Sequence, residues 1–103
     1  MWDEANTHCS NKTKQLLEPK TAEEFAMAKK VRSEIGIFWL GGSDQAQEGV
    51  WKWQSDNSSV AMDWFWLEGK PNKLDAYGCM STFNRGFYDF DCTYWYPSVC
   101  ESL

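Results

Sequence analysis

The residues best suited to chemistry lie between Lys70 and Cys92. The Lys70-Pro71-Asn72 triplet opens this stretch, and Asp89 stands near its end. The amide oxygen of Asn72 and the carboxylate of Asp89 can accept hydrogen bonds or ligate a cation, and the Lys70 ammonium offers three N–H donors. This combination favours the binding of a polar ligand.

Catalysis is not expected, so the protein is predicted not to be an enzyme. His8 is the only histidine and lies beside Cys9 in a predicted helix, which leaves no Ser-His-Asp or Cys-His arrangement once the cysteines are paired. Asp89 and Asp91 alternate in a predicted strand, but sharing a face does not imply acid–base chemistry. No phosphate-cradling loop or metal-hydrolase motif occurs.

The composition predicts a single domain over residues 1–103. Hydrophobic residues make up 43% of the chain, enough for a core, and aromatic residues make up 17%. The net charge of −5 argues against nucleic-acid binding, which requires a basic patch. No apolar run approaches the roughly 20 residues that cross a bilayer, so no membrane span is expected.

Four cysteines, Cys9, Cys79, Cys92 and Cys100, indicate two disulfides formed in an oxidising compartment. The sequence alone leaves three pairings open. A zinc site is the alternative, but zinc-binding cysteines usually come in closer pairs than Cys92 and Cys100.

The chain is expected to be secreted and extracellular. Sequons at Asn11 and Asn57 fit that location. The first residues lack the basic and apolar regions of a signal peptide, so a leader has been removed or the chain is a fragment.

Two helices are predicted first. Residues 2–9 place Trp2, Ala5 and Cys9 on one face. Residues 11–20 are expected to form a loop. Thr21 and Glu24 form a capping box that opens the second helix, and Gly36 ends it. The apolar stripe of the second helix comprises Phe25, Ala28, Val31 and Ile35.

Short strands follow the helices. Residues 37–40 predict a buried strand that ends at the breaker Gly41-Gly42, and residues 50–53 predict the next one. Helices followed by short strands indicate an α+β fold, with two helices packed on small antiparallel sheets.

The second half of the chain is expected to hold a long loop. Residues 66–77 show little periodicity and are predicted to be a polar ligand-binding loop. Strands are expected around Cys79 and Cys92, and residues 98–100 close the chain.

Four groups of residues occur in a fixed order along nearly the whole chain. They are Trp2-x-Glu4-Ala5-x3-Cys9; Trp39-Leu40-Gly41-Gly42 with Glu48-Gly49-x-Trp51-x-Trp53; Trp66-x3-Lys70-Pro71-Asn72 leading to Cys79; and Asp89-x-x-Cys92 followed by Val99-Cys100-Glu101. This order resembles the C-type lectin-like domain and implies its fold.

The resemblance implies the disulfides Cys9–Cys100 and Cys79–Cys92. In the chain-entropy model these bonds contribute about 4–5 and about 3 kcal/mol of stability. Family members usually carry a further strand before the first helix. This sequence begins inside that helix, so its last strand is expected to have a bare edge. A truncated sequence, a compact member of the family and a domain that borrows the partner strand are all left open.

The resemblance also implies a sugar site. Sugar-binding members hold a calcium ion at positions that correspond here to Lys70, Asn72, Tyr77, Tyr88 and Asp89. Calcium takes six to eight oxygen ligands. Only Asn72 and Asp89 keep suitable ones, so no cofactor is expected and calcium has few ligands left. Lys70 is expected to lie between Asn72 and Asp89. There its ammonium either contacts the sugar in place of calcium or forms only a surface salt bridge, worth at most about 1 kcal/mol.

An auxiliary calcium site of the family corresponds to Asp44 and Glu48, with partners near Lys73 and Gly78. Neither of the latter two offers a side-chain oxygen. We therefore expect Glu48 to shape its turn and Asp44 to be solvated.

The aromatic residues divide into core and surface. Trp39, Trp51, Trp53, Trp66 and Phe87 are predicted to lie in the core. Other rings near the site suit a sugar face or a protein partner. They are Tyr77, Tyr88, Tyr94, Trp95 and Tyr96.

The sequence therefore predicts a lectin module that binds glycans around Lys70 and Asn72 without the usual calcium bridge. The alternative is a domain that has lost sugar binding and binds a protein partner. A homo-oligomer is left open, and ice or mineral binding has no specific support.

Overall fold

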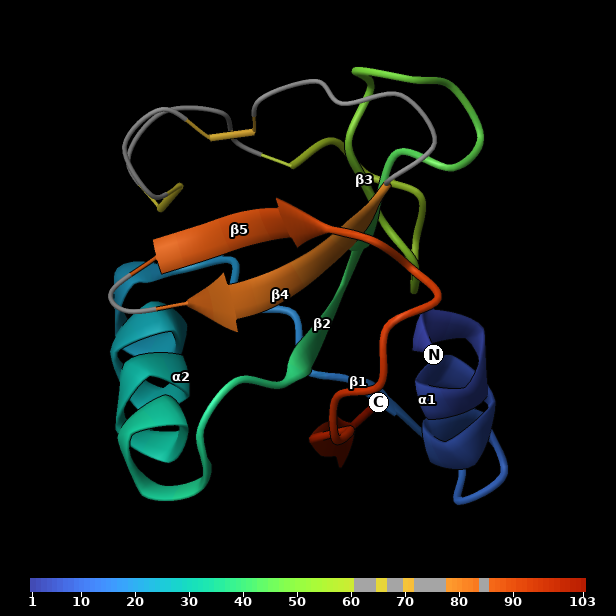
Figure 1. Ribbon diagram of the computed structural model, residues 1–103. Coiled ribbons are helices and arrows are strands. Elements are labelled where there is room, and N and C mark those ends of the chain that lie inside the picture. The colour runs from blue at the N-terminus through green and yellow to red at the C-terminus, as the bar shows by residue number, and fades with distance from the viewer. Residues whose placement is uncertain (61–64, 67–69, 72–77, 84–85) are drawn as a thin grey trace.

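The computed structural model describes residues 1–60, 65–66, 70–71, 78–83 and 86–103. The elements in chain order are α1 (Trp2–Ser10), β1 (Lys14–Leu16), α2 (Ala22–Ile35), β2 (Trp39–Ser43), β3 (Lys52–Trp53), β4 (Cys79–Phe83), β5 (Gly86–Phe90) and β6 (Cys100–Ser102). Figure 1 shows α1 and α2 on opposite sides of the central strands, with β1 and β6 at one end and β3 at the other. The α+β class is confirmed.

Helix α1 buries the face that its apolar spacing predicts. Trp2, Ala5 and Cys9 are buried. The indole Nε1 of Trp2 donates to the carbonyl of Leu40 at 2.7 Å, and its backbone N–H donates to the carbonyl of Cys92 at 2.9 Å. The start of α1 is therefore fixed to β2 and to the segment after β5.

The loop predicted over residues 11–20 is wrong in its middle, where the structure has β1. This strand pairs antiparallel with β6, with Leu16 opposite Cys100, and so gives the closing strand a partner along one edge. Leu16 is buried. A strand of three residues is too short for alternation to reveal it, because its pairing with a distant segment decides its conformation.

Helix α2 begins and ends where the sequence predicts. The Oγ1 of Thr21 accepts the N–H of Glu24 at 3.1 Å, and Gly36 follows with φ +88°. The return bond of the capping box differs from expectation, since Glu24 accepts the N–H of Lys20 rather than that of Thr21. Ile35, predicted to continue the apolar stripe, is exposed.

The larger sheet has the strand order β3-β2-β4-β5, with antiparallel neighbours. Its strand β2 runs through Gly41 and Gly42, which the sequence predicted to be a breaker. A Cβ on Gly41 would lie 2.6 Å from Cγ of Glu18, so the glycine permits close approach inside the strand. The expected strand over 50–53 is only two residues long, and Gly42 pairs with its Trp53.

Strands β4 and β5 form a hairpin with Cys79 opposite Phe90 and Ser81 opposite Tyr88. The strand expected at Cys79 is confirmed, whereas β5 ends two residues before Cys92. The expected loop over 66–77 is described only at Trp66 and at residues 70–71, and the rest lies outside the described residues.

The core has two parts, one on each face of the larger sheet. The first contains Phe38, Leu40, Trp51, Trp53, Val60, Phe65, Trp66, Met80 and Phe87. The second contains Trp2, Ala5, Cys9, Leu16, Trp39 and Cys79. All four tryptophans predicted to be core residues are buried, and so is Phe87.

Two disulfides close the fold in the pairing that the resemblance implies. Cys9–Cys100 joins α1 to β6, and Cys79–Cys92 joins the start of β4 to the segment after β5. Among the described helices, none is long and apolar enough to cross a membrane.

Candidate functional site

The structure brings together two of the predicted site residues, Lys70 and Tyr88. The Nζ atom of Lys70 lies 4.5 Å from the centroid of the Tyr88 ring, within the range of a cation–π contact. The Lys70–Pro71 peptide bond is cis. Asn72 and Tyr77 lie outside the described residues, as does Lys73.

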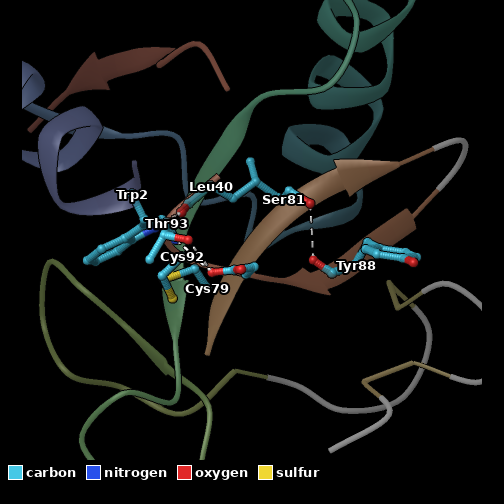
Figure 2. Close-up of a disulfide and its surroundings, with 8 residues drawn as sticks. Trp2, Leu40, Cys79, Ser81, Tyr88, Cys92 and Thr93 are labelled. Carbon is cyan, nitrogen blue, oxygen red and sulfur yellow. Dashed lines mark hydrogen bonds between the residues drawn. A yellow bond between two sulfur atoms is a disulfide. The ribbon is translucent and has the colours of Figure 1, made fainter. Parts of the chain in front are cut away.

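Strand β5 holds Tyr88 in place. The carbonyl of Tyr88 accepts the hydroxyl of Ser81 at 3.2 Å from the neighbouring strand, while its ring points away from Ser81 (Figure 2). Alternation along the strand sends Phe87 and Asp89 to the opposite face. Phe87 is 1% exposed and Asp89 is 6% exposed, so Tyr88 is the half-buried residue between two buried ones.

Two of the residues at the family's calcium positions, Lys70 and Tyr88, do not fit a calcium ion. Lys70 brings a positive charge, and Tyr88 brings a ring and a neutral phenol in place of a carboxylate or amide oxygen. Within the described part of the chain, no group of three or more His, Cys, Asp or Glu residues could hold a metal ion.

The auxiliary position is built differently from our expectation, because Asp44 is buried rather than solvated. Its Oδ2 accepts the N–H of Gly49 at 2.8 Å, and its own N–H donates to the carbonyl of Gly78 at 2.9 Å. Asp44 therefore closes the turn that contains Glu48, and the Glu48 side chain is exposed. A Cβ at position 78 would collide with Oδ1 of Asp44, which explains the glycine there.

Four aromatic rings, here called the aromatic row, extend from Lys70 along β5 and the segment that follows. They belong to Tyr88, Phe90, Tyr94 and Tyr96. The ring centroids of Tyr88 and Phe90 are 5.9 Å apart, those of Phe90 and Tyr94 are 5.0 Å apart, and those of Tyr94 and Tyr96 are 5.2 Å apart. Tyr96 also contacts the buried ring of Trp39 at 5.1 Å.

The pKa of the Tyr96 phenol at the end of the aromatic row is raised. Burial raises the pKa of Tyr96, and the neighbouring Tyr94 and Tyr88 raise it further. A protonated phenol both donates and accepts hydrogen bonds. The row thus presents apolar ring faces together with neutral hydroxyl groups.

Asp91 forms the turn that carries Tyr94. Its Oδ1 accepts the N–H of Thr93 at 2.9 Å and the hydroxyl of Thr93 at 2.7 Å, and its carbonyl accepts the N–H of Tyr94. These bonds from Thr93 lower the pKa of the Asp91 carboxyl. The carboxylate of Asp91 therefore serves to form a turn. Its alternation with Asp89 in the sequence does not indicate a carboxylate pair for acid–base chemistry.

Trp95 lies at a groove that borders the aromatic row. It is 73% exposed, and the groove has a volume of about 330 Å³ and lies beside α1. Glu4 and His8 of α1 also line this groove, together with Tyr96 of the aromatic row, Pro97 and Ser98. The groove is lined by aromatic rings and by titratable side chains, a combination that is typical of a surface that contacts another molecule.

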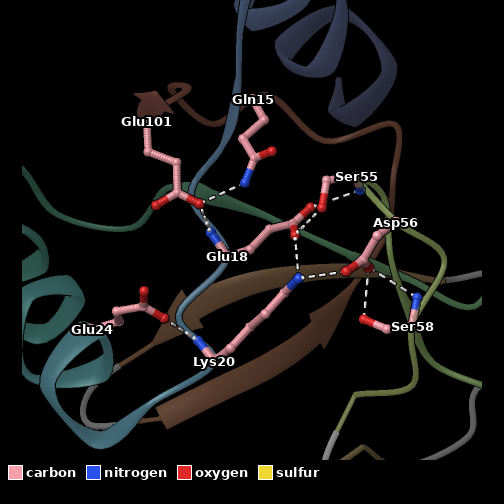
Figure 3. Close-up of polar contacts among 8 residues, drawn as sticks. All are labelled: Gln15, Glu18, Lys20, Glu24, Ser55, Asp56, Ser58 and Glu101. Carbon is pink, nitrogen blue, oxygen red and sulfur yellow. Dashed lines mark hydrogen bonds and ion pairs between the residues drawn. The ribbon is translucent and has the colours of Figure 1, made fainter. Parts of the chain in front are cut away.

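The carboxylate of Glu18 is the centre of a polar network that the sequence did not predict (Figure 3). Glu18 is 2% exposed and accepts both the N–H and the hydroxyl of Ser55, at 3.0 and 2.7 Å. Lys20 lies 3.4 Å from Glu18 and 3.1 Å from Asp56. Nothing in the residue pattern marks a buried carboxylate in a segment that looks like a loop.

The network also connects to the two-stranded sheet. Glu101 of β6 accepts the backbone N–H of Glu18 at 3.0 Å and the side-chain amide of Gln15 at 2.7 Å. Partial burial lowers the pKa of Lys20, but the Asp56 and Glu18 carboxylates outweigh it and the pKa is raised. Hydrogen bonds from Ser58 and then from Lys20 lower the pKa of Asp56 to about 2.

Comparison with known proteins identifies the fold. The chain matches the family model of the lectin C-type domain over residues 1–102. The human C-type lectin domain family 17, member A is 34% identical over 105 residues, which cover 97% of this chain and 26% of the relative. The chain thus spans about a quarter of the length of that curated relative.

Two solved structures share the architecture. The mouse scavenger receptor C-type lectin carbohydrate-recognition domain aligns with a TM-score of 0.85 at 27% identity, covering 97% of this chain and 78% of the other. A calcium-independent type II antifreeze protein aligns with a TM-score of 0.79 at 30% identity, covering 96% and 75%. With the two helices, the two sheets and the disulfides in place, this chain belongs to the C-type lectin domain family.

Proposed function

We propose that this domain binds glycans at the surface around Lys70 and Tyr88 without a bridging calcium ion. The observation that carries the proposal is the Lys70 ammonium 4.5 Å from the Tyr88 ring centroid. A cation and an aromatic ring stand together where calcium-binding members have oxygen ligands.

The two side chains suit the two kinds of surface on a sugar. The ammonium donates hydrogen bonds to hydroxyl, acetamido or carboxylate oxygens. The ring can pack against the apolar C–H face of a pyranose. The ring contact also orients the flexible lysine before the ligand arrives, which lowers the entropy cost of binding.

The relatives support the same proposal. One solved relative is a carbohydrate-recognition domain, and another is a calcium-independent protein of the same fold. The two disulfides suit secretion into an oxidising extracellular setting, where glycans are abundant. A homo-oligomer would place several such sites side by side and raise the avidity for a multivalent glycan surface.

A second candidate function is binding of a protein partner. The observation that favours it is the 73% exposed indole of Trp95 beside the groove at α1. Tryptophan is enriched among residues that dominate the energy of protein interfaces. Tyr96 of the aromatic row also lines this groove, so Trp95→Ala is the variant that changes the groove without removing a ring of the row.

The test is a glycan array probed in calcium and again in a calcium chelator, with the wild-type domain and Lys70→Ala. We expect the same glycans to bind in both buffers and the Lys70→Ala signal to fall by about tenfold, the effect of losing one charged hydrogen bond. Lys29→Ala is the matched control, because Lys29 also lies over an aromatic ring, that of Phe25 at 5.1 Å, but on α2.

Three outcomes count against the proposal. Binding that disappears in chelator would show that calcium bridges the sugar. Equal loss in Lys70→Ala and Lys29→Ala would point to general charge rather than to the site. No glycan signal at all would favour the protein partner.

A further inference from the structure

The surface around Lys70 does not end at Tyr88. The ring of Tyr88 contacts that of Phe90 with centroids 5.9 Å apart, and Phe90 contacts Tyr94 at 5.0 Å. The contacts lead from the Lys70 ammonium to a ring carried by the segment after β5. A ligand that extends beyond the Lys70–Tyr88 pair would meet this row next.

Tyr94 is the most exposed ring of the aromatic row. Tyr88 and Phe90 are half-buried, whereas Tyr94 is 53% exposed. Tyr94 also has a phenol hydroxyl, and the phenol of Tyr96 beside it is held in its protonated form. Flat rings edged with neutral hydroxyl groups match a sugar chain, whose residues present apolar faces and polar rims.

The outer ring is held in position by its own turn. Asp91 accepts two hydrogen bonds from Thr93 and one from the N–H of Tyr94. Cys92 lies inside this turn and is tied to β4 through Cys79. A ring fixed before binding loses little conformational entropy when a ligand packs on it.

We propose that Tyr94, with Phe90 behind it, forms a second sugar subsite, so that the ligand of this domain is an oligosaccharide of two or more residues rather than a single terminal sugar. The inference rests on the proposed glycan binding at Lys70 and Tyr88. The first sugar residue packs at Lys70 and Tyr88, and the next one packs on the exposed face of Tyr94.

The test is an array that displays series of mono-, di-, tri- and tetrasaccharides of glucose, galactose, mannose and N-acetylglucosamine. The wild-type domain, Tyr94→Ala, Tyr94→Phe and Trp95→Ala are compared. Trp95→Ala is the control, because it removes a more exposed ring that faces the α1 groove. Urea unfolding of each variant checks that it is folded.

We expect wild-type binding to strengthen by about tenfold from mono- to disaccharide in at least one series, the equivalent of about 1.4 kcal/mol. Tyr94→Ala should lose that gain and retain the monosaccharide signal. Tyr94→Phe and Trp95→Ala should keep the gain, since the first retains the ring and the second leaves the row intact.

Each other result overturns the inference in a distinguishable way. Binding that is independent of chain length, or a gain that Tyr94→Ala keeps, removes the second subsite and leaves the proposed function standing. Loss of the gain in Trp95→Ala alone would place the second subsite at α1. Failure of every series to bind would overturn the proposed function together with the subsite.

Discussion

At the scale of single residues, Glu18 is the most buried of the described carboxylates. It is 2% exposed and accepts two hydrogen bonds from Ser55, with Lys20 at 3.4 Å. A buried carboxylate is stable only when such donors replace water. The turn at Ser55 therefore depends on the carboxylate of Glu18.

We predict that Glu18→Gln lowers the free energy of unfolding by about 2–3 kcal/mol, the size of a lost charged hydrogen bond in a buried site. Glutamine keeps the volume but replaces an acceptor with an NH2 donor that faces other donors. Urea unfolding followed by tryptophan fluorescence measures the change. Glu34→Gln, an exposed residue of α2, is the control and should stay within about 0.5 kcal/mol of wild type. Equal effects of the two variants would contradict the prediction.

The sequence could predict some site residues and not others. Lys70 and Tyr88 were found because a motif fixes their distance from Cys79 and Cys92. Asp44 was assigned to solvent because its burial is created by Gly78, which is distant in the sequence. Glu18 was missed for the same reason, since its donors come from Ser55. Burial of a polar group is a property of distant partners, and composition or spacing does not contain it.

At the scale of elements, local signals predicted the helices well and the shortest strands poorly. A helix is indicated by its capping residues and by the helical spacing of its apolar residues, and both signals involve residues only a few positions apart. The strands β1 and β3, of three and two residues, have no such period. Pairing with the distant strands β6 and β2 decides their position.

We predict unequal losses on removing the two disulfides. The Cys9–Cys100 bond closes a separation of 91 residues and the Cys79–Cys92 bond one of 13. In the chain-entropy model, replacing both cysteines of the first pair with Ala costs about 4–5 kcal/mol and of the second about 3 kcal/mol. Chemical denaturation of the two double variants measures the difference. A larger loss for the Cys79–Cys92 pair would contradict the entropic account and indicate that local packing around β4 dominates.

At the scale of the whole molecule, the two helices and the small sheet of β1 and β6 form a base, and the candidate site lies along the edge strand β5 (Figure 1). The base is held by disulfides and by the Glu18 network. Because these contacts lie away from Lys70, we expect the fold not to depend on an ion there. Stability and ligand binding can therefore be tested separately.

We predict that calcium does not raise the melting temperature of the domain. Lys70 brings a positive charge and Tyr88 a neutral phenol to positions where a calcium ion needs oxygen ligands with negative charge. A calcium site filled at a hundred times its dissociation constant would stabilise the fold by about 2.7 kcal/mol. For a domain of this size that is a rise of roughly 10–20 °C. Melting curves in calcium, in magnesium at equal ionic strength and in chelator should coincide.

The variant Lys70→Glu identifies what excludes the ion. It restores one carboxylate to the triplet, but Tyr77 and Tyr88 still lack the remaining oxygen ligands. We therefore expect its melting curves to coincide as well. A calcium-specific rise in Lys70→Glu alone would mean that the charge of Lys70 is the sole obstacle. A rise in the wild-type domain would mean that calcium binds despite Lys70, and the sugar site would then have to be explained with the ion in place.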